Sequence, residues 1–184
     1  MRVVAGTARG RTLVAPPGAR TRPTTDRVRE AIFNALWSRE AVHGARVVDL
    51  FAGSGALGVE ALSRGAAHVT FVDSDRAARQ AVRRNVEACG FADRATIVGA
   101  PVERWLAALD PAVRFDLAFC DPPYAFDGWD AVLGALPADL VVVESDGPVA
   151  LPPGWALVRE ARYGGTWVGF ASGSARRGVS GSAG

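Results

Sequence analysis

The stretch VVDLFAGSGALG at residues 47–58 constrains the fold more than any other part of the chain. A short apolar run ends in an acid, breaks into small residues and resumes with helical spacing, which predicts a buried parallel strand, a tight turn and a helix start. Gly53 and Gly55 leave the turn without side chains, so a ligand can approach the backbone closely. The helix start adds unpaired N–H groups and a positive dipole end. Such a turn is typical of a nucleotide-like cofactor site at the carboxyl edge of an open sheet.

Strand and helix patterns alternate after this stretch. Strands are expected at 46–51, 68–72, 95–98, 115–120 and 140–144, with helices at 56–64, 75–89, 102–109 and 129–136 between them. Two more strands, at 156–163 and 166–172, are joined by Gly164-Gly165, which is hairpin spacing. Repeated βα units imply a parallel sheet with helices on both faces. We therefore predict an α/β, Rossmann-like fold with a mostly parallel sheet that an antiparallel strand closes.

The first thirty residues are basic. They hold seven arginines and two acids, a net +5, so that −3 remains for the rest of a chain whose total is +2. A basic segment on a slightly acidic body indicates a polyanionic partner at that end, although a solvated surface is the ordinary fate of arginine. We expect phosphate contacts at Arg9, Arg11, Arg20, Arg22, Arg27 and Arg29.

Residues 3–5 and 12–14 are strand candidates around a Gly-rich turn, which predicts a small basic hairpin, with a frayed terminus as the alternative. A Pro/Gly/Arg linker follows, and Thr24-Thr25-Asp26 offers cap residues for a helix to about residue 39. The expected organisation is a hairpin and linker at 1–23, one domain at 24–171, and a disordered Gly/Ser tail at 172–184.

The composition narrows the class of protein. No apolar run approaches the roughly eighteen residues of a membrane span, and no signal-peptide pattern opens the chain, so we expect a cytoplasmic protein without membrane contact. Cys89 and Cys120 lie far apart and in no CxxC pair, so we expect neither a disulfide framework nor a metal site.

The tetrapeptide Asp121-Pro122-Pro123-Tyr124 ends the fourth strand pattern and falls at the same sheet edge as the glycine turn. Its prolines fix the backbone, and Pro122 holds Asp121 extended, so the carboxylate is aimed. The Asp121 carboxylate and the Pro122 carbonyl can each accept one N–H of an exocyclic amine, while Tyr124 stacks on the base. The set is suited to presenting a base nitrogen to a methyl electrophile; a rigid loop with a capping aspartate is the structural alternative.

The glycine turn alone does not decide the cofactor. Gly53-x-Gly55-x-x-Gly58 also satisfies the dinucleotide fingerprint, with Asp73 about twenty residues on. Asp73 suits ribose hydroxyls, or it caps the next helix; no arginine follows it immediately to accept a 2′-phosphate, which argues against NADP. An NAD-binding oxidoreductase remains an alternative, although His43 and His68 lie outside the expected crevice and leave it without a proton donor.

With these residues in view, the chain resembles the bacterial 16S ribosomal RNA (guanine-966-N2)-methyltransferases, within the class I S-adenosylmethionine-dependent methyltransferases. The likeness spans about residues 2 to 170 and is carried by the stretches 22–34, 49–66, 71–73 and 121–124. It implies a seven-stranded sheet with its last strand antiparallel, and S-adenosylmethionine as the cofactor. Its implied partner is 16S rRNA in an assembled or partly assembled small ribosomal subunit, because a small domain with one basic arm has little surface for choosing naked RNA. We expect the enzyme to be a monomer.

The resemblance also assigns roles to residues. Asp49, Gly53 and Gly55 would line the methionine end of the cofactor and Asp73 its ribose. The tetrapeptide at 121–124 would hold the guanine amine, and the 22–29 segment would cap the site and meet RNA. Other expected cofactor contacts are the loop neighbours Ala52, Ser54, Ser74 and Ala100.

One departure and two further alternatives accompany this assignment. Gly99-Ala100-Pro101 stands where related enzymes often carry an acid for the adenine amine, so Glu103 or a backbone carbonyl would have to serve. The tetrapeptide is shared with many amino-group methyltransferases, so an adenine-N6 DNA methyltransferase is an alternative. A non-catalytic RNA-binding adaptor is another, but it would leave Asp121 unexplained.

Overall fold

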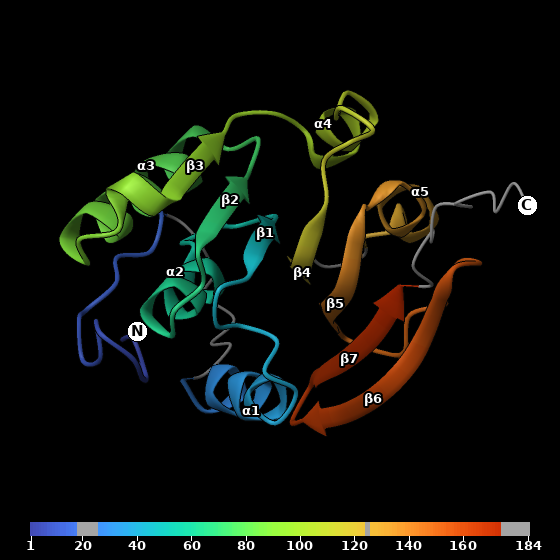
Figure 1. Cartoon of the computed structure of the whole chain (residues 1–184), viewed down its shortest axis with the longest axis horizontal. Helices are drawn as coiled ribbons and strands as arrows, with labels where there is room; N and C mark the ends of the chain where they lie inside the picture. The colour runs from blue at the N-terminus through green and yellow to red at the C-terminus, as the bar shows by residue number, and fades with distance from the viewer. Residues whose placement is uncertain (18–25, 124–125, 174–184) are drawn as a thin grey trace, which may run out of the picture.

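Seven strands form one sheet in the order β3-β2-β1-β4-β5-β7-β6 (Figure 1). The structure is a computed structural model that describes residues 1–17, 26–123 and 126–173 of the chain. Neighbours from β3 to β5 pair in parallel, whereas β7 runs antiparallel to both β5 and β6. The predicted fold class is confirmed. The strands are β1 Arg46–Leu50, β2 His68–Val72, β3 Ala95–Val98, β4 Phe115–Cys120, β5 Ala138–Ser145, β6 Trp155–Tyr163 and β7 Thr166–Gly173.

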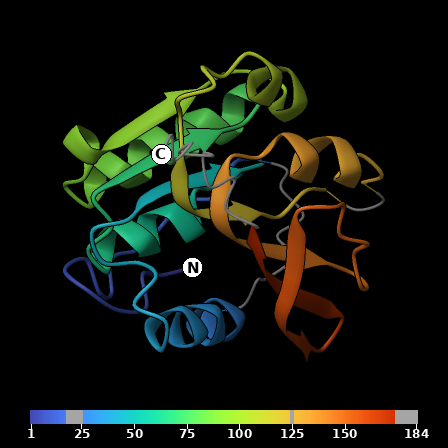
Figure 2. The same cartoon turned by 45° about the vertical axis from the view of Figure 1, so that its right-hand side comes forward.

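Helices cover both faces of the sheet (Figures 1 and 2). Alternate side chains of β4 separate two cores: Leu117 and Phe119 pack on the side of the first three helices, Ala118 and Cys120 on the side of the last two. Because both faces are covered, the central strands are apolar almost throughout. The helices are α1 Asp26–Trp37, α2 Ala56–Ser63, α3 Arg76–Ala88, α4 Val102–Ala107 and α5 Trp129–Ala135, with a short 3-10 turn, η1 Ala92–Arg94, before β3. No helix among them is long and apolar enough to cross a membrane.

The antiparallel hairpin extends the sheet further than its sequence pattern suggested. β7 continues to Gly173, because Ser172 pairs with Leu140 of β5 and Gly173 with Trp155 of β6. Residues 172 and 173, assigned above to a disordered tail, are therefore held by the sheet. The remainder of that tail, 174–184, lies outside the described residues.

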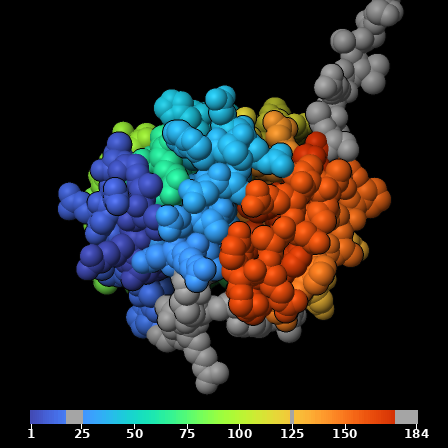
Figure 3. All heavy atoms as spheres, turned by 90° about the horizontal axis from the view of Figure 1, so that it is seen from below, coloured from blue at the N-terminus to red at the C-terminus, as the bar shows by residue number. Residues whose placement is uncertain are grey.

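The N-terminal arm, residues 1–15, is fixed more by the body than by itself. In place of two paired strands it has one isolated antiparallel bridge, Arg2 with Thr12, flanked by a hydrogen bond from Val3 N to Arg11 O of 3.0 Å. Val3 and Leu13 are buried in the core that α1, α2 and α3 share. Figure 3 shows the arm, α1 and the β6–β7 hairpin side by side on one face.

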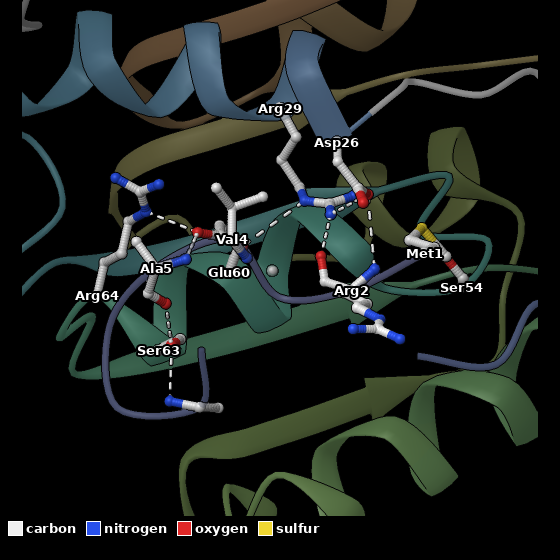
Figure 4. A network of polar contacts seen from close by, with 12 residues as sticks. Met1, Arg2, Val4, Ala5, Asp26, Arg29, Ser54, Glu60, Ser63 and Arg64 are labelled. Atoms are coloured by element: carbon white, nitrogen blue, oxygen red, sulfur yellow. Dashed lines mark hydrogen bonds and ion pairs between the residues drawn. The ribbon is translucent and has the colours of Figure 1, made fainter. Parts of the chain in front are cut away.

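A buried carboxylate on α2 anchors the arm (Figure 4). Glu60, with 0% of its surface exposed, accepts hydrogen bonds from the backbone amides of Val4 (2.7 Å) and Ala5 (3.0 Å) and from Arg64 Nε (2.8 Å). Its second cationic neighbour is Arg29 of α1, whose Nε lies 3.6 Å away. A buried charge is tolerated when it is paired and hydrogen-bonded in this way.

Arg29 is a correction to the set of arginines expected to contact RNA. It is buried, 1% exposed, and donates to Arg2 O and to Asp26 Oδ1 (2.8 Å) while it faces Glu60. The four-residue apolar spacing of α1 did not reveal this, because arginine at position 29 flanks the stripe formed by Val28 and Ile32. Its charge joins the arm to α1 and is not presented to a partner.

We expect Gly58→Ala to destabilise the protein by about 1–3 kcal/mol, because overpacking a filled core forces neighbours to shift. A Cβ at Gly58 would lie 2.2 Å from Phe71 Cε1 and 2.9 Å from Val69 Cγ1, and Phe71 is itself buried. Urea unfolding measures the change. Gly134→Ala on α5 is the matched control, since no atom lies within 4 Å of its added Cβ, and it should stabilise by roughly 0.5–1 kcal/mol. Equal unfolding midpoints for the two variants would contradict the close packing of α2 on β2.

Candidate active site

The glycine loop between β1 and α2 presents bare backbone. Gly53 (φ 55°) and Gly55 (φ 73°) adopt left-handed conformations, and so does the non-glycine Phe51 (φ 57°). Ala52 N donates to Val72 O (3.2 Å) and Gly55 N to Ala52 O (2.6 Å), which fixes the turn. A Cβ built on Gly53 would meet no atom closer than 3.9 Å, so the space over this residue is open. Bare backbone beside open space lets a ligand approach the turn closely.

Asp49 sets this loop against α2. It is the one acid of β1 and is 2% exposed, and its Oδ2 accepts a hydrogen bond from Gly58 N (2.9 Å). Burial raises the pKa of Asp49 to about 8; the N–H of Gly58 acts against this rise, and the charges of Asp121 and Asp73 add to it. The side chain is therefore mostly protonated at pH 7, and a cation in the site would favour its ionised form.

Asp73, directly after β2, holds the other side of the loop. Its Oδ2 accepts from Gly53 N and its Oδ1 from Asp75 N, both at 2.8 Å. The alternative in which Asp73 caps the next helix is wrong, because Asp75 is the cap of α3 and accepts from Ala78 N (2.9 Å). Ser74 between them is exposed.

The register of β1 and β4 brings Asp121 to the glycine loop. Leu50 pairs with Cys120, so Asp121 follows β4 at the level where Phe51 follows β1. The charge of Asp121 raises the pKa values of both Asp49 and Cys120, although burial is the larger cause in each case. Asp121 and Pro122 are half-buried and Pro123 is exposed; Tyr124 lies outside the described residues.

The third strand leads to the same edge. Ala100 is half-buried just beyond β3, whereas Gly99 is crowded: a Cβ there would lie 2.9 Å from Arg79 Nε. Glu103, on the first turn of α4, contributes to the raised pKa of Cys120 after burial, Asp121 and Asp49.

Sequence reasoning missed Glu144. It belongs to β5, is 2% exposed, and stands one residue past Val143, the partner of Cys120, so it is level with Asp121. Strand alternation directs it to the face of the sheet that Asp49 and Asp121 share. The available signal was an acid that ends an apolar run, LVVVE, in the same way that Asp49 and Asp73 end theirs.

The described basic residues expected to meet RNA lie on the arm and on α1. Arg9, Arg11 and Arg27 are exposed, Arg29 is buried, and Arg20 and Arg22 fall outside the described residues. Within the described ranges, no group of three or more His, Cys, Asp or Glu side chains is arranged to hold a metal ion.

Comparison with known proteins decides the family. The sequence profile of the family described as conserved hypothetical protein 95 matches residues 1–172. The chain belongs to this family. Ribosomal RNA small subunit methyltransferase D of Escherichia coli is 38% identical over 170 residues, 87% of this chain and 83% of that protein; the Haemophilus influenzae protein of the same name is 34% identical over 174 residues, 89% of each. The resemblance drawn from the motifs is confirmed.

Solved structures agree with the family assignment. The Escherichia coli protein yhhF is similar with a TM-score of 0.83 and 36% identity over 96% of this chain and 99% of that one. A further relative by sequence is the Bacillus subtilis protein YlbH, an rRNA methyltransferase by name, which is 40% identical over 91% of this chain and 96% of its own length. The chain is thus a methyltransferase of this family along nearly its whole length.

Asn85 connects the arm of this methyltransferase to its glycine loop. The side chain is 1% exposed; its Oδ1 accepts from Val14 N (2.9 Å), and its Nδ2 donates to Val14 O (2.9 Å) and Ser54 O (2.8 Å). One amide on α3 therefore satisfies both backbone groups of the arm residue and one carbonyl of the loop. Sequence reasoning also missed this residue, because an asparagine inside a helix pattern carries no signal of its distant partners.

We expect Asn85→Ala to cost roughly 1–3 kcal/mol of stability, because it removes three part-buried hydrogen bonds to the backbone of Val14 and Ser54. The Val14 amide should also exchange faster with solvent in the variant. Denaturant unfolding and hydrogen exchange measure the two effects. Gln80→Ala, on the exposed side of the same helix, should stay within about 0.5 kcal/mol of the parent. An unchanged exchange rate at Val14 would show that Asn85 does not secure the arm.

Proposed function

We propose that this chain methylates the exocyclic N2 amine of guanine 966 of 16S rRNA, with S-adenosylmethionine as the methyl donor. The substrate we infer is an assembled or partly assembled small ribosomal subunit. The names of the Escherichia coli and Haemophilus influenzae relatives, ribosomal RNA small subunit methyltransferase D, support this target. The position of the methylated atom follows from the motif resemblance.

The observation that carries the proposal is the parallel pairing of β1 with β4. It sets the Asp-Pro-Pro turn beside the glycine loop, so a base held at Asp121 and a cofactor held at Gly53 would be neighbours. Proximity and alignment of this kind supply roughly 7–11 kcal/mol of the barrier in a group transfer.

The residues present fit the cofactor. The loop is open over Gly53, and the cluster of Asp49, Asp73 and Asp121 suits a molecule with cationic groups. S-adenosylmethionine supplies a methyl group on a positively charged sulfur. We infer that Asp49 and the backbone at 52–55 hold its methionine end, that Asp73 and Ser74 hold its ribose, and that Ala100 adjoins its adenine.

The turn at Asp121 has groups for orienting an amine. Its carboxylate and the Pro122 carbonyl each accept one N–H of an –NH2 group, and Pro123 has no N–H that could compete. Because the attacking nitrogen becomes more acidic as it gains a methyl group, Asp121 can accept the proton late in the transfer. Tyr124 is the residue we assign to stacking.

The alternatives lose support at specific residues. His68 opens β2, at the opposite end of the strand from the crevice, and its Nε2 lies 2.9 Å from Thr96 Oγ1; this leaves an oxidoreductase without that proton donor. The tetrapeptide could hold the N6 amine of adenine in the same way, so the assay described below distinguishes the two targets. We assign the RNA contacts of the arm and α1 to Arg9, Arg11 and Arg27.

The assay uses the full-length protein, labelled S-adenosylmethionine, and in parallel small subunits that lack the methylation, naked 16S rRNA and DNA. Nucleoside analysis of the product should give N2-methylguanosine in rRNA from subunits, mapped to position 966. Label on DNA adenine alone, or on no nucleic acid, would rule the proposed target out.

Asp121→Ala should reduce the transfer rate at least 100-fold, because one of the two acceptors of the amine is lost. Calorimetry with S-adenosylhomocysteine should give an affinity within a few-fold of the parent. Asp116→Ala, an exposed acid near the start of the same strand, is the control for charge and should keep its activity, although it loses a hydrogen bond to Arg46 N. A large loss of cofactor affinity in Asp121→Ala would contradict the division of roles between Asp121 and the glycine loop.

Cofactor binding should release a proton at pH 7. Asp49 is protonated below a pKa of about 8 in the ligand-free protein, and a cationic ligand favours its ionised form, so the observed affinity should rise with pH toward 8 and then level off. By the same linkage, the raised pKa makes the ligand-free protein lose stability as pH increases from about 4 to 8, since the folded state binds the proton and the unfolded state does not. Calorimetry in buffers of different ionisation enthalpy counts the proton. Asp49→Asn should abolish the release, and release retained in that variant would assign it to another group.

A further inference from the structure

Helix α3 carries a concentration of positive charge that the proposed catalytic roles leave unused. It has four arginines and one glutamate in thirteen residues. Three of them, Arg76, Arg79 and Arg83, line an open hollow of about 390 Å³ together with Gln80. Their spacing of three, four and seven residues places them on one side of the helix.

No described carboxylate forms an ion pair with the arginines of this hollow. Among the described residues, the arginines with a carboxylate oxygen at ion-pair distance are Arg29 and Arg64, and both belong to the Glu60 cluster. Arg76 and Arg83 are exposed, whereas Arg79 is half-buried. The residues that line the hollow are three arginines and one glutamine, and each of these side chains ends in hydrogen-bond donors.

The hollow adjoins the cofactor edge. Arg79 Nη1 donates to the carbonyls of Asp73 (3.1 Å) and Ser74 (2.7 Å), and its guanidinium lies against Gly99 after β3. Arg76 occupies the first position of α3, directly after the Asp75 cap, where the helix dipole adds positive potential. The arginines therefore flank the same edge of the sheet as the glycine loop.

The acids of the crevice indicate what the neighbouring arginines of α3 would bind. The charges of Asp73 and Asp121 repel phosphate, so a nucleic acid that places a base there needs its backbone held at the rim. Arg76 and Arg83 are separated by seven residues, about 10 Å along the helix, which exceeds the size of one anion, so the two side chains would contact different phosphates of a strand.

We propose that the α3 hollow is a phosphate-binding rim that holds the backbone of the substrate RNA on the β3 side of the crevice. Arg76 and Arg83 contact phosphates, Gln80 supplies a neutral hydrogen-bonding group between them, and Arg79 fixes the loop at Asp73–Ser74 to this rim. This inference rests on the proposed function for the identity of the RNA. It adds a contact surface that is separate from the arm.

The test is the double variant Arg76→Gln, Arg83→Gln of the full chain, which leaves Arg79 and its loop contacts intact. Binding of small subunits and of a 16S rRNA fragment is measured from 50 to 200 mM salt. Loss of two phosphate contacts should reduce the slope of log affinity against log salt by roughly 1.4–1.8, so the defect shrinks about tenfold across this range. KM for subunits should rise with kcat nearly unchanged, and affinity for S-adenosylhomocysteine should be that of the parent. The control pair Arg104→Gln, Arg159→Gln removes two exposed charges from α4 and β6 and should keep the parental slope.

Other outcomes overturn the inference. A slope and KM equal to those of the parent would show that the hollow does not meet RNA. An equal defect in the control pair would show an effect of net charge alone, and a loss of cofactor affinity with an unchanged slope would assign the hollow to the cofactor loop. The methylation assay with the parent protein tests the proposed function separately. If that function is wrong, the parent leaves rRNA unmethylated, whatever the salt dependence of its binding.

Discussion

The buried carboxylate of Asp49 is the interaction on which the site depends. Its bond to Gly58 N joins the end of β1 to the first turn of α2, and the glycine loop is the chain that remains between these two fixed points. The loop can have left-handed residues and few side chains because both its ends are held. Asp73 adds a second attachment through Gly53 N. The cost of burying Asp49 is expressed in its raised pKa, which ties the geometry of the loop to the charge of a ligand.

Acids near the carboxyl end recur in the neighbouring strands of the sheet. Acids follow or end the apolar runs of β2, β1, β4 and β5, at Asp73, Asp49, Asp121 and Glu144, and parallel pairing brings all four strand ends to one edge. Because the central strands are buried on both faces, their charged side chains stand near the strand ends. The acidic crevice and its basic flanks are therefore consequences of the strand order as much as of individual residues.

Much of this could be read from the sequence for a physical reason. Strands β2, β3 and β4 were placed to the residue, because continuous apolar runs bounded by turn residues leave little freedom, and the glycine loop and the tetrapeptide were found because their chemistry is local. Contacts across long separations could not be read in the same way. The prediction that Arg29 contacts RNA rests on the number of arginines around it in the sequence, whereas its burial depends on Glu60. Asn85, Glu144 and the α3 hollow likewise acquire their meaning from neighbours that only the fold supplies.

The anchoring of the arm has a consequence for how the protein is made. Val4 and Ala5 bind a carboxylate 56 and 55 residues further along the chain, and Val14 binds an amide 71 residues further on. During translation the arm therefore emerges well before either partner has been synthesised, and it cannot dock until α3 has left the exit tunnel. Val3 and Leu13, which are buried in the folded protein, remain uncovered in that interval. The arm is synthesised before α3 and has to wait for that helix before it reaches its place.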